Sequence, residues 1–309
     1  MSRLLDIQEQ LLNTNAALAR MERAVAEDPS SSSVQAMGRS LKKREQALES
    51  AFLAEANSLG VDVCTYRLFG DSDSPTIAGL SKVLGDFQTF VSTVYDAIKT
   101  AAPKERARVS SNIARETSFE FGYVFAGSLG IVLTVPNERL LMGESKLDET
   151  MKTVFAMARA TDSSQILEHA KQLGPASVRA MYNWAVGHTR YGLGVDIQWR
   201  REHVVRADLL AQKPELERLS AAIEITSDEK EEQFDRECEL VGADVTRQSF
   251  HLKLSTGEDI RGSFKDAISP SQTVELPKRY KATLLKTTSI KYSTGEEKVS
   301  YKLLRLDLI

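Results

Sequence analysis

The sequence predicts an α+β protein with three parts: an N-terminal antiparallel helical hairpin of coiled-coil character, a mixed α/β middle domain and a small five-stranded C-terminal β-barrel, SH3-like or OB-like. At the N-terminus, apolar residues recur at heptad spacing. In the middle, segments with helical spacing of apolar residues alternate with strand-like segments. At the C-terminus, short segments of alternating apolar and polar residues are separated by turn residues. The expected boundaries are 1–60 for the hairpin, 61–225 for the middle domain, 226–235 for an acidic linker and 236–309 for the barrel.

Composition is that of an ordinary water-soluble chain. Its 309 residues are 42% hydrophobic and 27% charged, which allows two domains with buried cores. No apolar run approaches the roughly 18 residues that span a bilayer, and the N-terminus lacks the apolar region of a secretory signal. Cys64 and Cys238 lie too far apart in the sequence to suggest a disulfide framework. We therefore expect a cytoplasmic protein that does not contact membranes.

The first helix is predicted from an apolar seam. Leucines and a valine recur every seven residues, and Asp28-Pro29 followed by a serine run ends the element. A second helix, over about 33–59, completes the hairpin. The seam can pack on the chain's own domain, or it can pair with another copy or a protein partner. The candidate interface residues are Leu4, Ile7, Leu11, Leu18 and Met21.

The middle domain is expected to mix strands and helices. Alternating aromatics at 119, 121, 123 and 125 predict a β-hairpin over 117–135, with one aromatic face against the long helix that starts at Ser74-Pro75. A helix is also predicted over 207–225, with Pro214 near its true start. The other expected elements are strands at 61–69 and 193–199 and helices at 144–160, 163–173 and 175–188.

The C-terminal segment is the only net basic part, with 13 Lys and Arg against 10 Asp and Glu over 236–309. The five expected strands are 237–246, 248–255, 258–264, 279–290 and 298–309. Cations beside aromatics on a barrel are typical of single-strand nucleic-acid binding, although lysines on exposed strands also prevent edge pairing. The candidate contacts with DNA or RNA are Lys278, Arg279, Tyr280, Lys281, Lys286 and Lys291.

Signatures of catalysis are missing from the sequence. It contains no P-loop, HExxH or CxxC motif, so we predict no catalytic residue, metal site or cofactor. One carboxylate pair, Asp196 with Glu120, suggests a metal-dependent nuclease if the two converge from neighbouring strands. The alternative is that both face outward, as strand alternation allows.

These features favour a non-catalytic scaffold or adaptor, which self-associates or holds a protein partner through its N-terminal helices and binds a ligand through its barrel. The first alternative is a nucleic-acid-binding component of a larger bacterial complex, and the second is the nuclease. Two segments, FGYVFAGSLGIVLTV and FHLKLSTGEDIRGSF, resemble uncharacterised cytoplasmic proteins of bacterial mobile-element and phage-defence loci. The resemblance implies such a defence setting but no activity and no residue role.

Overall fold

The protein is described from a computed structural model that covers residues 2–70, 75–125, 129–137, 144–264 and 277–309. It divides into two compact units, Met1–Ile225 and Thr226–Ile309. The α+β class and the five-stranded C-terminal barrel are confirmed. Within the described ranges, every helix is too short or too polar to cross a bilayer.

The first unit is built on a five-stranded antiparallel sheet with strand order β2-β3-β1-β4-β5. The strands are β1 (Val61–Gly70), β2 (Glu120–Phe125), β3 (Gly130–Pro136), β4 (Leu193–Arg201) and β5 (Val204–Ala211). Alternation along β1 buries Cys64, Tyr66 and Leu68 on one face and leaves Thr65 and Arg67 on the other.

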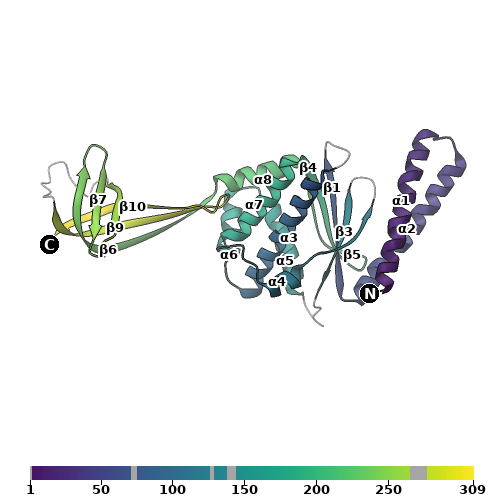
Figure 1. The fold of residues 1–309 in the computed structure, drawn as a ribbon, viewed down its shortest axis with the longest axis horizontal. Helices are drawn as coiled ribbons and strands as arrows, with labels where there is room; N and C mark the ends of the chain where they lie inside the picture. The colour runs from purple at the N-terminus through teal and green to yellow at the C-terminus, as the bar shows by residue number, and fades with distance from the viewer. Residues whose placement is uncertain (1, 71–74, 126–128, 138–143, 265–276) are drawn as a thin grey trace. The chain divides into compact units, whose positions relative to one another are not determined.

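Helices pack on the apolar face of this sheet (Figure 1). They are α3 (Ile77–Thr100), α4 (Ser111–Thr117), α5 (Lys146–Ala158), α6 (Ser163–Leu173), α7 (Pro175–Arg190) and α8 (Lys213–Ile225). The main core lies between these helices and the sheet, and its largest fully buried side chains include Trp184, Trp199 and Tyr66. Large aromatics here bury the most apolar area per residue, so this layer is the main source of stability in the unit.

Two long helices, α1 (Ser2–Glu27) and α2 (Ser32–Ser58), lie side by side against the other face of the sheet. Arg3 pairs with Glu55, and Gly38 lies against Met21, so the helices run in opposite directions. A second core, made by Ile7, Leu11, Phe52, Tyr123 and Val132 among others, joins them to β2 and β3.

The predicted aromatic face was wrong. The register shifts between Phe121 and Tyr123, so the aromatics of this segment separate. Phe119 stacks on Phe87 of α3 with ring centroids 5.5 Å apart, whereas Tyr123 meets Phe52 of α2 edge-on at 5.2 Å. Phe121 is 61% exposed. For the helix predicted over 207–225, the start near Pro214 is confirmed, because α8 begins at Lys213. The residues before it are corrected, because 204–211 pair with β4 as strand β5.

The second unit is a closed barrel with strand order β10-β8-β7-β6-β9. Its strands are β6 (Ser227–Asp244), β7 (Ser249–Leu254), β8 (Asp259–Phe264), β9 (Lys278–Lys291) and β10 (Glu297–Leu308). Leu240, Leu252, Ala282 and Leu284 lie in the fully buried interior with other apolar side chains. Parallel pairing of β8 with β10 at Phe264 and Leu303 closes the ring.

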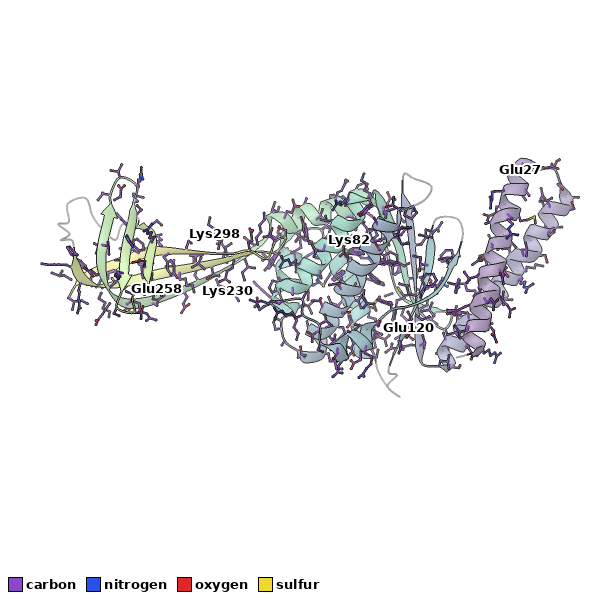
Figure 2. The ribbon with its side chains drawn as sticks, viewed as in Figure 1. Glu27, Lys82, Glu120, Lys230, Glu258 and Lys298 are labelled. Carbon is purple, nitrogen blue, oxygen red and sulfur yellow. The ribbon has the colours of Figure 1, made fainter. Side chains whose placement is uncertain are left out.

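The stretch 226–235 is not a linker. Residues 227–235 form the first half of β6 and pair with β9 in continuous antiparallel register. The acidic run is stable as a strand because β9 places cations opposite it: Glu232 faces Lys286, and the Lys281 ammonium lies 3.2 Å from the Asp235 carboxylate. In this part β6, β9 and β10 form an exposed three-stranded ribbon that carries Lys230 and Lys298 (Figure 2).

Candidate functional site

The apolar seam of α1 divides into a covered and an uncovered half. Ile7 is 7% exposed and Leu11 is fully buried, both in the core shared with α2 and the sheet, and Leu4 packs partly against the same core. Leu18 and Met21, two and three turns further along, are only partly buried. The structure therefore places three of the five candidate interface residues inside or against the unit's own core.

The uncovered half forms a groove between α1 and α2, which we call the distal groove. Its cavity has a volume of about 400 Å³. Leu18, Met21 and Val25 give it an apolar floor. Charged groups of both signs flank that floor, with an acid on α1 and two cations on α2. The lining residues are Leu18, Met21, Glu22, Val25, Gln35, Gly38, Arg39 and Lys42.

The six candidate nucleic-acid residues lie on β9 but do not form one surface. Alternation turns Tyr280 into the barrel core, where it is 6% exposed. Lys281 points to the outer side and pairs with Asp235, while Lys286 belongs to the opposite face of the strand and lies across from Glu232. The remaining candidates, Lys278, Arg279 and Lys291, are exposed near the two ends of β9. Acidic β6 runs beside the whole strand, so the local potential is mixed.

The carboxylates proposed for a nuclease are far apart. Glu120 lies on β2, three strand spacings away from β4 in the sheet. The cross-strand register runs from Glu120 to Thr134, then to Val63, and reaches β4 at Arg200. The path from Glu120 to Asp196 crosses three strand spacings of about 4.8 Å and then runs four residues along β4, from Arg200 to Asp196. The two carboxylates are therefore roughly 20 Å apart. Glu120 lies on edge strand β2 (Figure 2). No metal or water could contact both groups, so the geometry does not supply the site that the nuclease hypothesis requires.

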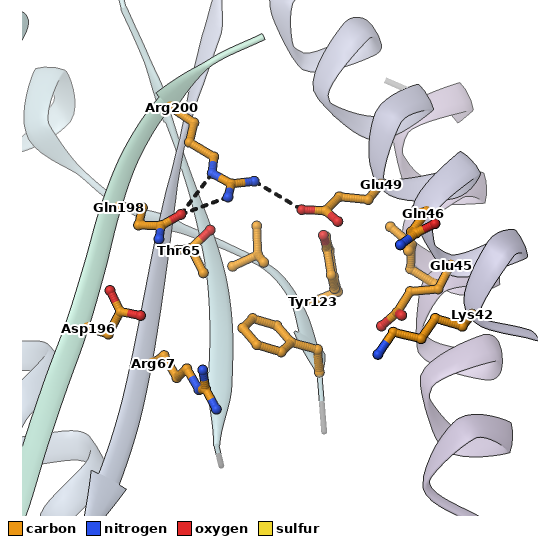
Figure 3. A pocket seen from close by; sticks show the side chains of 13 residues that line it. Lys42, Glu45, Gln46, Glu49, Thr65, Arg67, Tyr123, Asp196, Gln198 and Arg200 are labelled. Carbon is orange, nitrogen blue, oxygen red and sulfur yellow. Dashed lines mark hydrogen bonds and ion pairs between the residues drawn. The ribbon is translucent and has the colours of Figure 1, made fainter. Parts of the chain in front are cut away.

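A cleft lies between α2 and the face of the sheet that α1 and α2 cover. We call it the inter-layer cleft. Its volume is about 330 Å³, and the walls come from α1, α2 and four strands. Arg200 closes one end: its guanidinium donates to Gln198 at 2.7 and 3.1 Å and to Glu49 at 3.1 Å (Figure 3). The lining residues are Leu11, Lys42, Glu45, Gln46, Glu49, Thr65, Arg67, Tyr123, Phe125, Val132, Asp196, Gln198 and Arg200.

Sequence reasoning identified Asp196 as a candidate carboxylate but missed this cleft. The signal available was the run of polar residues at every second position of the two central strands, Thr65 and Arg67 on β1 and Asp196, Gln198 and Arg200 on β4. Such a pattern indicates a sheet face that no apolar layer fully covers.

Two buried polar networks stabilise the fold. Trp184 Nε1 donates to the Tyr66 hydroxyl at 2.9 Å, and this hydroxyl lies 2.7 Å from His188 Nε2. Because the hydroxyl oxygen already accepts from Trp184, we assign its proton to the bond with Nε2. Burial lowers the pKa of His188 to about 3, so the ring is neutral. The side chains of Trp184, Tyr66 and His188 line neither the distal groove nor the inter-layer cleft, so this network is structural.

The second network surrounds Arg201. Its guanidinium donates to Asp62 at 2.8 and 3.0 Å and to Asp148 at 2.9 and 3.0 Å. Burial disfavours the charged Asp148 carboxylate, but the Ser145 backbone N–H and the Arg201 guanidinium outweigh it and hold the pKa of Asp148 below its ordinary value. The pair of acids shares one cation, so Arg201 fixes the end of β4 to β1 and α5.

Among the described residues, no three His, Cys, Asp or Glu side chains gather in the way a metal ion requires. Comparison of the chain with family models, with curated proteins and with solved structures found no match.

Proposed function

We propose that the protein is a non-catalytic scaffold that self-associates through the distal groove of α1 and α2. The proposal depends on the division of the apolar heptad seam of α1. The chain's own sheet covers the half around Leu11, whereas the half around Leu18 has the same spacing but lines an open groove. An apolar stripe that continues past its own core is typical of a helix that buries its end against another helix.

A second copy of the chain suits the groove because its charges are self-complementary. Glu22 lies on α1, and Arg39 and Lys42 lie on α2 of the same groove. A two-fold axis across the groove brings α1 of one copy to α2 of the other, so the contact between Glu22 and the partner's cations occurs twice per dimer. The product is a four-helix arrangement in which Leu18, Met21 and Val25 of both copies share one core.

In this proposal the C-terminal barrel is the ligand-binding part of the scaffold, of the SH3-like or OB-like kind. Nucleic acid is the alternative ligand that the basic residues of β9 suggest. The acids of β6 beside them reduce the attraction for phosphates, so the observations favour the scaffold over a nucleic-acid-binding component.

Sedimentation velocity on the full chain tests self-association. We expect a concentration-dependent dimer in the wild type and a monomer when Leu18→Glu and Met21→Glu are combined, because each buries a charge in an apolar core. Leu5→Glu is the matched control, since Leu5 is on the same helix, 61% exposed and outside the groove. A wild type that stays monomeric up to about 100 μM, well above micromolar affinities, would remove the proposal.

A further inference from the structure

The inter-layer cleft contains two carboxylates that have no direct partner in the described part of the chain. The formal charges of its lining balance, with Lys42, Arg67 and Arg200 against Glu45, Glu49 and Asp196. Arg200 is neutralised by Glu49, and Arg67 already has a polar interaction within the chain. Two partly buried carboxylates, Asp196 on β4 and Glu45 on α2, have no hydrogen bond or ion pair with another described residue. They come from opposite walls of the cleft (Figure 3).

Glu45 is held in a setting that disfavours its charge. Burial raises the pKa of this carboxyl most, and the charge of Glu49 raises it further. Lys42 opposes this by lowering the pKa, and Glu22 adds the smallest contribution, which raises it. Lys42 itself is exposed and lies at the mouth of the cleft. A cation inside the cleft would therefore stabilise the ionised carboxylate directly.

Tyr123 adds a hydroxyl to the polar groups that line the cleft. The side chain is 5% exposed and lines the cleft, yet its hydroxyl has no hydrogen-bond partner among the residues that the structure describes. The hydroxyl oxygen is not one of the fully buried unpaired atoms of the described residues, so it is open to the cavity that the side chain lines. Figure 3 shows the hydroxyl end of the ring on the side of Arg200 and Glu49. This unpaired group is therefore available to a molecule in the cavity.

Aromatic rings form part of the same wall. Phe125 lines the cleft next to Tyr123, and its ring occupies space that Gly130 leaves open: a Cβ at Gly130 would lie 2.0 Å from the ring. Tyr and Phe faces attract organic cations, and the attraction grows when the cation is desolvated. The glycine thus allows an aromatic ring to lie at this cleft.

We propose that the inter-layer cleft binds a small organic cation with ammonium or guanidinium groups, which contacts Asp196 and Glu45 on opposite walls and the Tyr123 hydroxyl between them. A volume of about 330 Å³ accommodates a molecule of a few heavy atoms, and an aliphatic diamine is the simplest one that reaches both carboxylates. Binding in this cleft does not require self-association, although Lys42 lines both the cleft and the distal groove.

Isothermal titration calorimetry on the full-length protein, with three probes that share a four-carbon backbone, shows which charged groups the cleft prefers. Putrescine carries two ammonium groups, 4-aminobutyrate replaces one by a carboxylate, and 1,4-butanediol carries no charge. We expect putrescine to bind tightest and butanediol to give no heat, at matched ionic strength. Equal binding of putrescine and butanediol, tighter binding of 4-aminobutyrate, or no putrescine binding at about 10 mM would each overturn the proposal.

Conservative variants locate the site. Asp196→Asn and Glu45→Gln should each weaken putrescine binding about tenfold or more, because each removes a charge-assisted contact. Tyr123→Phe keeps the ring and should weaken binding by a smaller factor. Glu120→Gln is the control, since it removes a carboxylate from the same sheet roughly 20 Å away. Tryptophan fluorescence confirms that each variant is folded, and unchanged affinity in folded Asp196→Asn and Glu45→Gln would refute the assignment.

Discussion

Acidification should destabilise the first unit through one buried histidine. His188 accepts a hydrogen bond from Tyr66, which is itself fixed by Trp184, so Nε2 must be unprotonated in the folded chain. Burial lowers the pKa of His188 from an ordinary value of 6.5 to about 3. Between these two values the unfolded chain binds a proton that the folded chain does not. The stability that neutral His188 provides is therefore complete above about pH 6.5 and is lost as the pH falls toward 3.

The expected loss follows from linkage. Each pH unit below the unfolded pKa costs about 1.4 kcal/mol, so lowering the pH from 7 to 5 should reduce the free energy of unfolding by about 2 kcal/mol through this residue. Replacement by glutamine keeps an acceptor for Tyr66 but does not titrate. The difference in stability between wild type and His188→Gln should therefore shrink or reverse as the pH falls.

Urea unfolding followed by tryptophan fluorescence is the assay. The chain has two tryptophans, Trp184 and Trp199, and both lie in the first unit, so the signal reports that unit alone. Unfolding is measured for both proteins at pH 7, 6 and 5. Parallel losses in the two proteins would assign the effect to other groups and refute the role given to His188.

Three further predictions concern the seam, the barrel closure and the basic strand. Leu11→Ala should lower the free energy of unfolding by about 2–4 kcal/mol in the same urea assay, because truncating this buried side chain leaves a cavity. Leu18→Ala leaves no such cavity and should lower it by less than about 1 kcal/mol under monomeric conditions. Equal losses in the two variants would contradict the divided seam. Gly262→Ala should open the barrel, since a Cβ there would lie 2.1 Å from the Tyr301 carbonyl oxygen; hydrogen exchange should rise in β8 and β10 while tryptophan fluorescence stays constant. We expect no oligonucleotide binding by fluorescence anisotropy at about 50 mM salt. Salt-dependent binding that Lys281→Ala and Lys286→Ala weaken would support the nucleic-acid alternative instead.

Elements with strong local periodicity could be predicted from the sequence. The apolar spacing of residues 77–98 and the Gly174-Pro175 break are local signals, and they correspond to α3 and to the boundary between α6 and α7. The barrel strands were likewise predicted from alternation and turns. The aromatic strand was not, because one register shift at Gly122 sends neighbouring side chains to different partners.

Features that depend on distant pairing could not be predicted. Residues 226–235 look solvated because the cations that compensate them are on β9, some fifty positions later in the chain. The inter-layer cleft has the same origin: Glu45, Tyr123 and Asp196 line one cavity only after the sheet has paired and α2 has packed on it. The seam was recognised from its heptads, but which half is covered depends on where the sheet ends.

A charge-swap experiment tests the scaffold most directly. Glu22→Arg places like charges at both symmetry-related contacts of the proposed dimer, and Arg39→Glu does the same with the opposite sign. In sedimentation velocity we expect each variant alone to be monomeric and an equimolar mixture of the two to form a heterodimer, because mixing restores opposite charges at both contacts. Variants that dimerise as well as the wild type, or a mixture that stays monomeric while the wild type dimerises, would contradict self-association through the distal groove.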